Sequence, residues 1–138
     1  MRKVIFTLPL ALMLAAPAAL SGTAEVKLSE KEQASFDKIV EGRTAGKPVS
    51  CISRNDQKNM RVVGDKYLIY SRTRNAKTVY VNQPHGGCRD VDRHTLVTRR
   101  FSGNLCRGEI GLVEDFNSGA FVDSCSFSSF VPYTKTEG

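Results

Sequence analysis

The chain has 138 residues, of which 41% are hydrophobic and 25% charged, and its formal charge is +6 at pH 7. This length allows one domain with a modest core, and the absence of internal repeats or low-complexity segments excludes a repeat array. The basic balance favours anionic partners without identifying one.

Residues 1–24 have the three parts of a secretory signal peptide. A positive start at Arg2-Lys3 precedes the almost wholly apolar stretch Val4–Leu20, and small residues follow. A transmembrane anchor is the weaker alternative, because the apolar stretch is short, contains two prolines and lacks a charged stop. We predict cleavage after Ala24, with Ala18 as the second choice. The mature chain would carry about +4, be periplasmic or secreted, and have no transmembrane segment.

Residues 25–46 are predicted to form a short helix followed by a linker. Ser29 and Glu32 make a capping box, in which each side chain can bond the backbone N–H of the other residue. An apolar stripe follows for about three turns and ends at Gly42. Its members are Ala34 or Phe36, Ile39 and Val40. Residues 43–48 are assigned to the linker because Gly46 and Pro48 interrupt any helix.

From Val49 onward the apolar period changes to two, which is typical of β-strands. Gly64-Asp65 suits a tight hairpin turn between two of them. The predicted strands are Val49–Ser53, Met60–Val63, Lys66–Ser71, Lys77–Gln83, Leu96–Phe101, Glu109–Glu114 and Ala120–Phe130. Six to seven short strands predict a mainly β fold, a small antiparallel barrel or sandwich preceded by one N-terminal helix. The β domain would span residues 47–133, and residues 134–138 would form a loosely ordered tail.

All four cysteines lie in the predicted mature chain, and an even count in an exported protein predicts two structural disulfides. Cys51 lies in the first predicted strand and Cys125 in the last, and these strands meet if the sheet closes. We therefore predict Cys51–Cys125 and Cys88–Cys106. There is no Cys-x-x-Cys, and His85-x-x-Cys88 is the one hint of metal-ligand spacing, so we predict no metal site and no cofactor.

Three of the cysteines belong to short motifs, and the fourth is the late Cys125. The motifs are Pro-x-x-Cys at Pro48–Cys51, Gly-Gly-Cys at Gly86–Cys88 and Leu-Cys-x-Gly-Glu at Leu105–Glu109. This arrangement resembles a family of small exported proteobacterial proteins of unknown function. The resemblance covers about residues 46–133, and the family has aspartate more often than glutamate at the position of Glu109. It implies export and a disulfide-stapled domain, but it carries no activity and no catalytic residue.

The stretch between residues 86 and 108 is rich in arginine. A Cys88–Cys106 bond would bring several of these side chains together, and such a group would suit an anionic envelope polymer or lipid. The candidate ligand-binding residues are Arg89, Arg93, Arg99 and Arg107. The alternative is a solvated surface on which Asp90, Asp92 and Glu109 neutralise the arginines.

Catalytic residues are not predicted. His85 and His94 are the only histidines, and neither Gly-x-Ser-x-Gly nor His-Glu-x-x-His occurs. A basic face carrying Tyr67, Tyr70 and Tyr80 would suit nucleic acid, but export argues against that partner. We expect a monomeric, non-catalytic binding or envelope-associated module of unknown ligand. A small periplasmic hydrolase using His94 or His85 is the alternative.

Overall fold

The computed structural model describes residues 25–100 and 102–137, so the predicted signal peptide lies outside the described residues. The two helical elements of the described part are α1 (Glu30–Val40) and the short 3-10 helix η1 (Arg54–Gln57). Its strands are β1 (Arg43–Ala45), β2 (Cys51–Ile52), β3 (Asn59–Val63), β4 (Tyr67–Ser71), β5 (Thr78–Asn82), β6 (Thr95–Thr98), β7 (Leu105–Cys106), β8 (Ile110–Glu114), β9 (Phe121–Ser126) and β10 (Phe130–Lys135).

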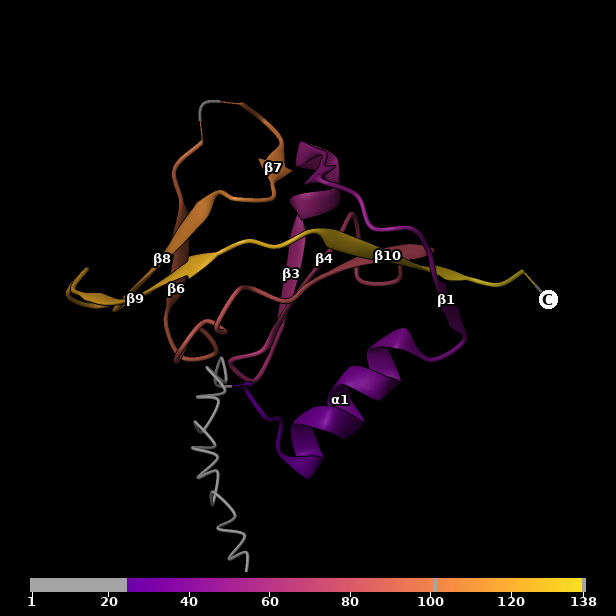
Figure 1. Ribbon diagram of the computed structural model, residues 1–138, viewed down its shortest axis with the longest axis horizontal. Coiled ribbons are helices and arrows are strands. Elements are labelled where there is room, and N and C mark those ends of the chain that lie inside the picture. Colours follow the sequence, from indigo (N-terminus) through magenta and orange to yellow (C-terminus); the bar gives the residue numbers. More distant parts are fainter. Residues whose placement is uncertain (1–24, 101, 138) are drawn as a thin grey trace, which may run out of the picture.

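The strands form three antiparallel sheets in this part of the chain. A five-stranded sheet has the order β1-β10-β5-β4-β3, a three-stranded sheet has the order β6-β8-β9, and β2 pairs with β7. Figure 1 shows α1 below the strands and the β8–β9 hairpin extending to one side. The mainly β prediction is confirmed, in its sandwich form, because none of these sheets closes into a barrel.

The five-stranded sheet is covered on both faces along β4, which lies between β5 and the edge strand β3. Ile69 belongs to a cluster that packs against Phe36 and Ile39 of α1. Its neighbours Leu68 and Tyr70 point to the opposite face, into a cluster shared with the three-stranded sheet and with β2 and β7. Because alternate residues of β4 are covered on opposite sides, the strand is apolar almost throughout.

Helix α1 forms as the sequence predicts. The Ser29 side chain accepts the Glu32 N–H, and the Glu32 carboxylate accepts the Ser29 N–H at 2.8 Å. This reciprocal bonding lowers the pKa of Glu32, through the Ser29 backbone first and the Ser29 hydroxyl second. Gly42 follows the helix with φ of 67°, a left-handed conformation that favours glycine.

The linker prediction for residues 43–48 is wrong at its start, because Arg43–Ala45 is an edge strand. β1 pairs with β10, with Thr44 opposite Thr134. The Nε–H of Arg43 donates to Ile39 O at 3.1 Å, and another guanidinium nitrogen donates to Lys77 O. Backbone pairing with β10 therefore creates a strand in a segment that has no apolar alternation.

The predicted last strand, Ala120–Phe130, covers β9, a crossing and only the first residue of β10, which continues beyond the prediction. β9 pairs with β8, β10 pairs with β5, and the chain crosses between sheets at residues 127–129. The buried Asn82 side chain fixes this crossing by donating to Ser128 O at 2.7 Å. β10 also continues through Lys135, so the predicted loose tail is wrong for Thr134 and Lys135.

Both predicted disulfides are wrong. The bonds are Cys51–Cys106 and Cys88–Cys125. Cys51 lies directly opposite Cys106 because β2 pairs with β7 and not with the last strand. Cys88 lies at the three-stranded sheet, where the N–H of the next residue, Arg89, donates to Asp123 of β9 at 2.9 Å. The prediction of two disulfides is confirmed, and only their pairing changes.

Candidate functional site

Among the described residues, a cleft of about 900 Å³ lies between the N-terminal part around α1 and the five-stranded sheet. Its floor is the helix-facing side of β5 and β10, at Val81 and Val131. Helix α1 covers the neighbouring part of the sheet but does not cover this floor. Other lining residues include Glu25, Phe36, Lys66, Tyr67, His85, Gly86, Gly87, Ser128, Ser129 and Tyr133.

One wall of the cleft is aromatic. The rings of Phe36 and Tyr67 stack with centroids 4.4 Å apart, and Tyr133 meets Phe36 edge-on at 6.4 Å. The Nζ atom of Lys66 lies 5.5 Å from the centroid of Tyr67 and 3.6 Å from a Glu25 carboxylate oxygen. A flat apolar surface and a cation therefore stand side by side at this wall.

The opposite wall is the connection that follows β5. The backbone N–H of His85 donates to Ser126 O at 3.0 Å, while the His85 side chain stays exposed. Gly86 and Gly87 both have positive φ, and a Cβ at Gly87 would lie 2.7 Å from Asp65 O. Only glycine allows the chain to pass so close to this turn, and Cys88 then ties the wall to β9.

A third side of the cleft is the crossing between β9 and β10. Ser128 Oγ donates to Gln83 O at 2.7 Å, so the crossing is tied to the His85 wall. Ser129 also lines the cleft. Aromatic rings, hydroxyl groups, an ammonium and an imidazole thus converge on one concave surface, a combination that suits binding of a small molecule.

The four predicted arginines do not form one group around a disulfide. Arg89 donates from its guanidinium to Val122 O at 3.0 Å, and Arg93 pairs with Asp90 at 3.5 Å and with Asp92 at 3.8 Å. Arg99 is exposed just after β6, and Arg107 is exposed between β7 and β8 beside the other disulfide. The Cys88–Cys106 bond expected to gather them is absent. Their role in ligand binding stays a prediction.

His94 does have an acidic partner, since its Nδ1 lies 3.6 Å from Asp115 Oδ2. Ser118 donates from its backbone N–H and from its hydroxyl to Asp115 Oδ1, both at 2.8 Å. These Ser118 bonds, with smaller contributions from Asn117 and His94, lower the pKa of Asp115. The carboxylate lies between the serine and the histidine, so His94 does not accept the serine proton as a hydrolytic triad requires.

The three tyrosines considered for nucleic acid lie on different faces. Tyr67 faces α1, whereas Tyr70 and Tyr80 pair across β4 and β5 on the other side of the sheet. Across residues 25–100 and 102–137, no three His, Cys, Asp or Glu side chains are placed to hold a metal ion. The helices of the same residues include none long and apolar enough to cross a membrane.

Reasoning from the sequence missed the cleft. Phe36 was predicted only as a packing residue, and Tyr67 was considered only for stacking with bases. Lys66 and Tyr133 belong to no motif that indicates a binding site. Gly86-Gly87 was the available indication, because paired glycines beside a disulfide cysteine mark a close backbone approach. Comparison of the chain with protein-family models, with curated proteins and with solved structures finds no match in any of the three.

Proposed function

We propose that this protein is an exported, non-catalytic binding module that holds a small ligand in the cleft between α1 and the five-stranded sheet. The observation that carries the proposal is the cleft itself, whose volume of about 900 Å³ lies within the usual range of small-molecule sites. The described fold brings side chains from α1, β4, β5 and β10 to this one surface.

Export is supported by the two disulfides, because such bonds persist in oxidising compartments such as the periplasm or the extracellular space. The charge and apolar pattern of residues 1–24 supports the same destination. Cleavage after Ala24 would make Glu25 the first residue of the mature protein. Its new α-ammonium group would then lie at the mouth of the cleft, because Glu25 lines it.

The lining indicates the class of ligand. A ring or another flat apolar group fits the wall formed by Phe36, Tyr67 and Tyr133. An anionic group on the same ligand would meet Lys66, whose partner Glu25 is largely exposed and exchangeable with a ligand carboxylate or sulfonate. We therefore propose a small amphipathic anion, bound with its apolar face on the aromatic wall.

The two alternative functions have less support. A hydrolase using His94 requires the serine, histidine and carboxylate in a different order from the one observed. A polymer site formed by Arg89, Arg93, Arg99 and Arg107 requires these residues to share a surface, and Arg93 already pairs with two carboxylates.

The proposal is tested with the mature, oxidised protein and the dye 1-anilinonaphthalene-8-sulfonate, an aromatic anion whose fluorescence rises in apolar sites. We expect saturable binding of one dye per protein. Lys66→Gln should weaken it by about tenfold, as expected for loss of a charge-assisted contact. Lys58→Gln is the matched control, because this exposed lysine follows η1 and does not line the cleft.

A second pair of variants separates shape from charge. Ser129→Phe places a ring in the cleft and should abolish dye binding. Ser124→Phe adds the same ring at an exposed position of β9, outside the cleft, and should leave dye binding unchanged. Equal dye binding by these two folded variants would contradict the assignment of the ligand to this cleft.

A further inference from the structure

A second, smaller hollow lies on the far side of the five-stranded sheet, among residues that the cleft does not use. It has a volume of about 330 Å³ and is lined by Arg54, Thr98, Arg100, Ser102 and Gly103. These residues come from η1, from the end of β6 and from the β6–β7 connection. They meet because β2, which precedes η1, pairs with β7 and is joined to it by the Cys51–Cys106 bond.

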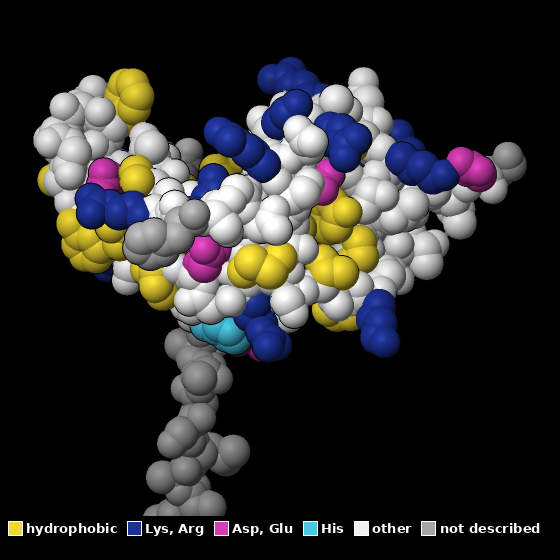
Figure 2. Space-filling view, turned by 90° about the horizontal axis from the view of Figure 1, so that it is seen from above, with side chains coloured by type: hydrophobic (Ala, Val, Ile, Leu, Met, Phe, Trp, Pro, Cys, Tyr) yellow, Lys and Arg dark blue, Asp and Glu magenta, His cyan; other side chains and the backbone are white. Residues whose placement is uncertain are grey.

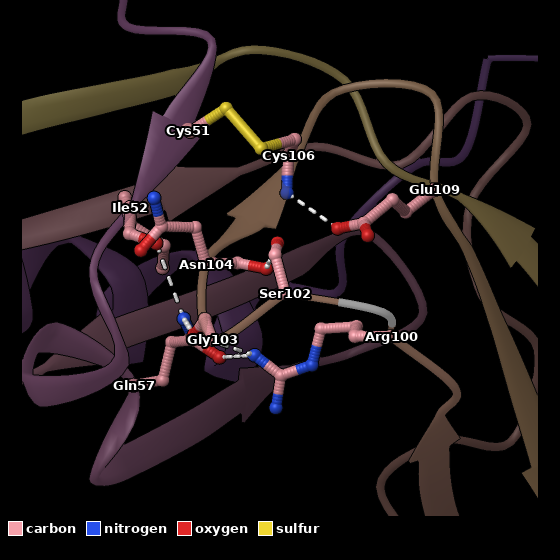
Figure 3. The surroundings of a disulfide bond; sticks show 9 residues. All are labelled: Cys51, Ile52, Gln57, Arg100, Ser102, Gly103, Asn104, Cys106 and Glu109. Atoms are coloured by element: carbon pink, nitrogen blue, oxygen red, sulfur yellow. Dashed lines mark hydrogen bonds between the residues drawn. A yellow bond between two sulfur atoms is a disulfide. The ribbon is translucent and has the colours of Figure 1, made fainter.

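Arg100 is held in place by neutral partners (Figure 3). One of its terminal nitrogens donates to the Gln57 side-chain oxygen and to Gly103 O. The Gln57 amide donates in turn to Ile52 O at 3.1 Å and to Gly103 O at 3.2 Å. This network fixes one edge of the guanidinium and supplies no counterion for its charge from the residues that the structure describes.

Arg54 approaches the same glycine from η1. A Cβ at Gly103 would lie 3.8 Å from the Cβ and the Cδ of Arg54, so the stem of Arg54 passes over Gly103. Two arginines thus line one small hollow, together with Thr98 and Ser102. Guanidinium and hydroxyl groups are all hydrogen-bond donors.

The charges of the two arginines are not neutralised by the carboxylates around them. Neither Arg54 nor Arg100 forms an ion pair with any residue in the described part of the chain. The nearby Asp56 accepts from Ser53 and pairs with Arg72 at 3.7 Å. Figure 2, which views this side of the molecule, shows more Lys and Arg side chains than Asp and Glu.

We propose that Arg54 and Arg100 form a site for a tetrahedral oxyanion, a phosphate or sulfate group. Guanidinium groups match the oxygens of such anions in pairs, and the Thr98 hydroxyl supplies a further donor. Two adjacent uncompensated cations also produce a local positive potential that attracts the anion. This site is independent of the proposed cleft ligand, because the two hollows share no lining residue.

The test is a titration of the mature, oxidised, isotope-labelled protein with inorganic phosphate and with inorganic sulfate, followed by NMR at low ionic strength. We expect saturable shifts of the amide signals of Ser102, Gly103 and Asn104. Arg54→Gln and Arg100→Gln should each weaken binding by about tenfold or more. Arg107→Gln removes the same charge from the neighbouring turn and should change the affinity by less than about twofold.

Several results would overturn the proposal. They are shifts that do not saturate, shifts centred elsewhere, and equal weakening by Arg107→Gln and Arg54→Gln. If Arg100→Gln fails to fold, Arg54→Gln decides the question, because Arg54 is exposed and its charge has no structural partner in the described residues. A second arm uses vesicles containing phosphatidic acid or only phosphatidylcholine. If the protein sediments with the phosphatidic acid vesicles and Arg54→Gln abolishes this, the anion is a lipid headgroup. If the protein binds phosphate but does not sediment with these vesicles, the anion is a soluble one.

Discussion

Gly87 is the position where one added methyl group should most disturb this fold. Its φ is 80°, and a Cβ there would lie 2.7 Å from both Asp65 O and Val26 Cγ2. The Val26 side chain can move, because it belongs to a segment that precedes the first helix. Asp65 O cannot, because it lies in the β3–β4 turn and accepts the N–H of Cys88 at 2.7 Å. Gly87→Ala must therefore displace the wall of the cleft from that turn.

The adjacent Gly86 provides a matched control. Its φ is 73°, but a Cβ there would meet no atom within 4 Å. An alanine in the left-handed conformation destabilises the folded state by about 1–2 kcal/mol. Because alanine also lowers the entropy of the unfolded chain, it offsets about 0.4–1 kcal/mol of this loss. Gly86→Ala should thus lower the free energy of unfolding by about 1 kcal/mol. Gly87→Ala adds an overpacking cost of about 1–3 kcal/mol, for a total of about 2–4 kcal/mol.

The measurement is urea unfolding of the oxidised mature protein, with both disulfides intact in every sample. The free energies can be compared if the denaturant slope is the same in the three proteins. We expect Gly87→Ala to be less stable than Gly86→Ala by at least about 1 kcal/mol. Equal losses would refute the argument, because only left-handed strain would then matter and the contact with Asp65 would not.

Three further outcomes follow from the disulfides and the acidic groups. Peptide mapping without reductant should recover Cys51 linked to Cys106 and Cys88 linked to Cys125, and a main species linking Cys51 to Cys125 would contradict the fold. Mild reduction followed by alkylation should label Cys51 and Cys106 first, since Cys51 is exposed whereas Cys88 and Cys125 are each 1% exposed. Asp115 has a folded-state pKa below its ordinary value, so its ionised form stabilises the fold above about pH 4 and this contribution is lost as the pH falls through the folded-state pKa. Asp115→Asn should accordingly flatten the loss of stability, measured by melting curves, as the pH falls below about 4.

The sequence predicts best those elements whose causes are local. The capping box of Ser29 and Glu32 depends on two residues within one short segment and is confirmed. The hairpin turn forms where Gly64-Asp65 predicts it, but it has three residues, because Val63 pairs with Tyr67 and Lys66 belongs to the turn. The disulfide pairing depended instead on the order of strands in space. The expectation that the strand carrying Cys51 meets the last strand is wrong, because β2 pairs with β7. The strand that pairs with β10 is β1, which lies in a segment without apolar alternation, so the sequence predicts a linker there.

The cleft could not be predicted for a related reason. Its aromatic wall combines Phe36 of α1, Tyr67 of β4 and Tyr133 of β10, which are far apart in the sequence. Each residue taken alone has the ordinary explanation that it fills the core. Their common surface becomes apparent only once β10 pairs with β5 and α1 leaves that part of the sheet uncovered.

Each disulfide supports a different hollow, so the two hollows should respond separately when one bond is opened. Cys88–Cys125 fixes the glycine wall of the cleft, while Cys51–Cys106 holds η1 against the connection that carries Arg100. The five-stranded sheet lies between the two hollows, with Tyr67 facing α1 and Tyr70 facing the side of Arg100. Burial raises the pKa of Tyr70, and the nearby charge of Arg100 partly opposes this effect. Opening Cys51–Cys106 alone should therefore weaken phosphate binding and leave dye binding in the cleft intact. Loss of both phosphate and dye binding on selective reduction would mean that β2 and β7 also support the cleft side of the sheet.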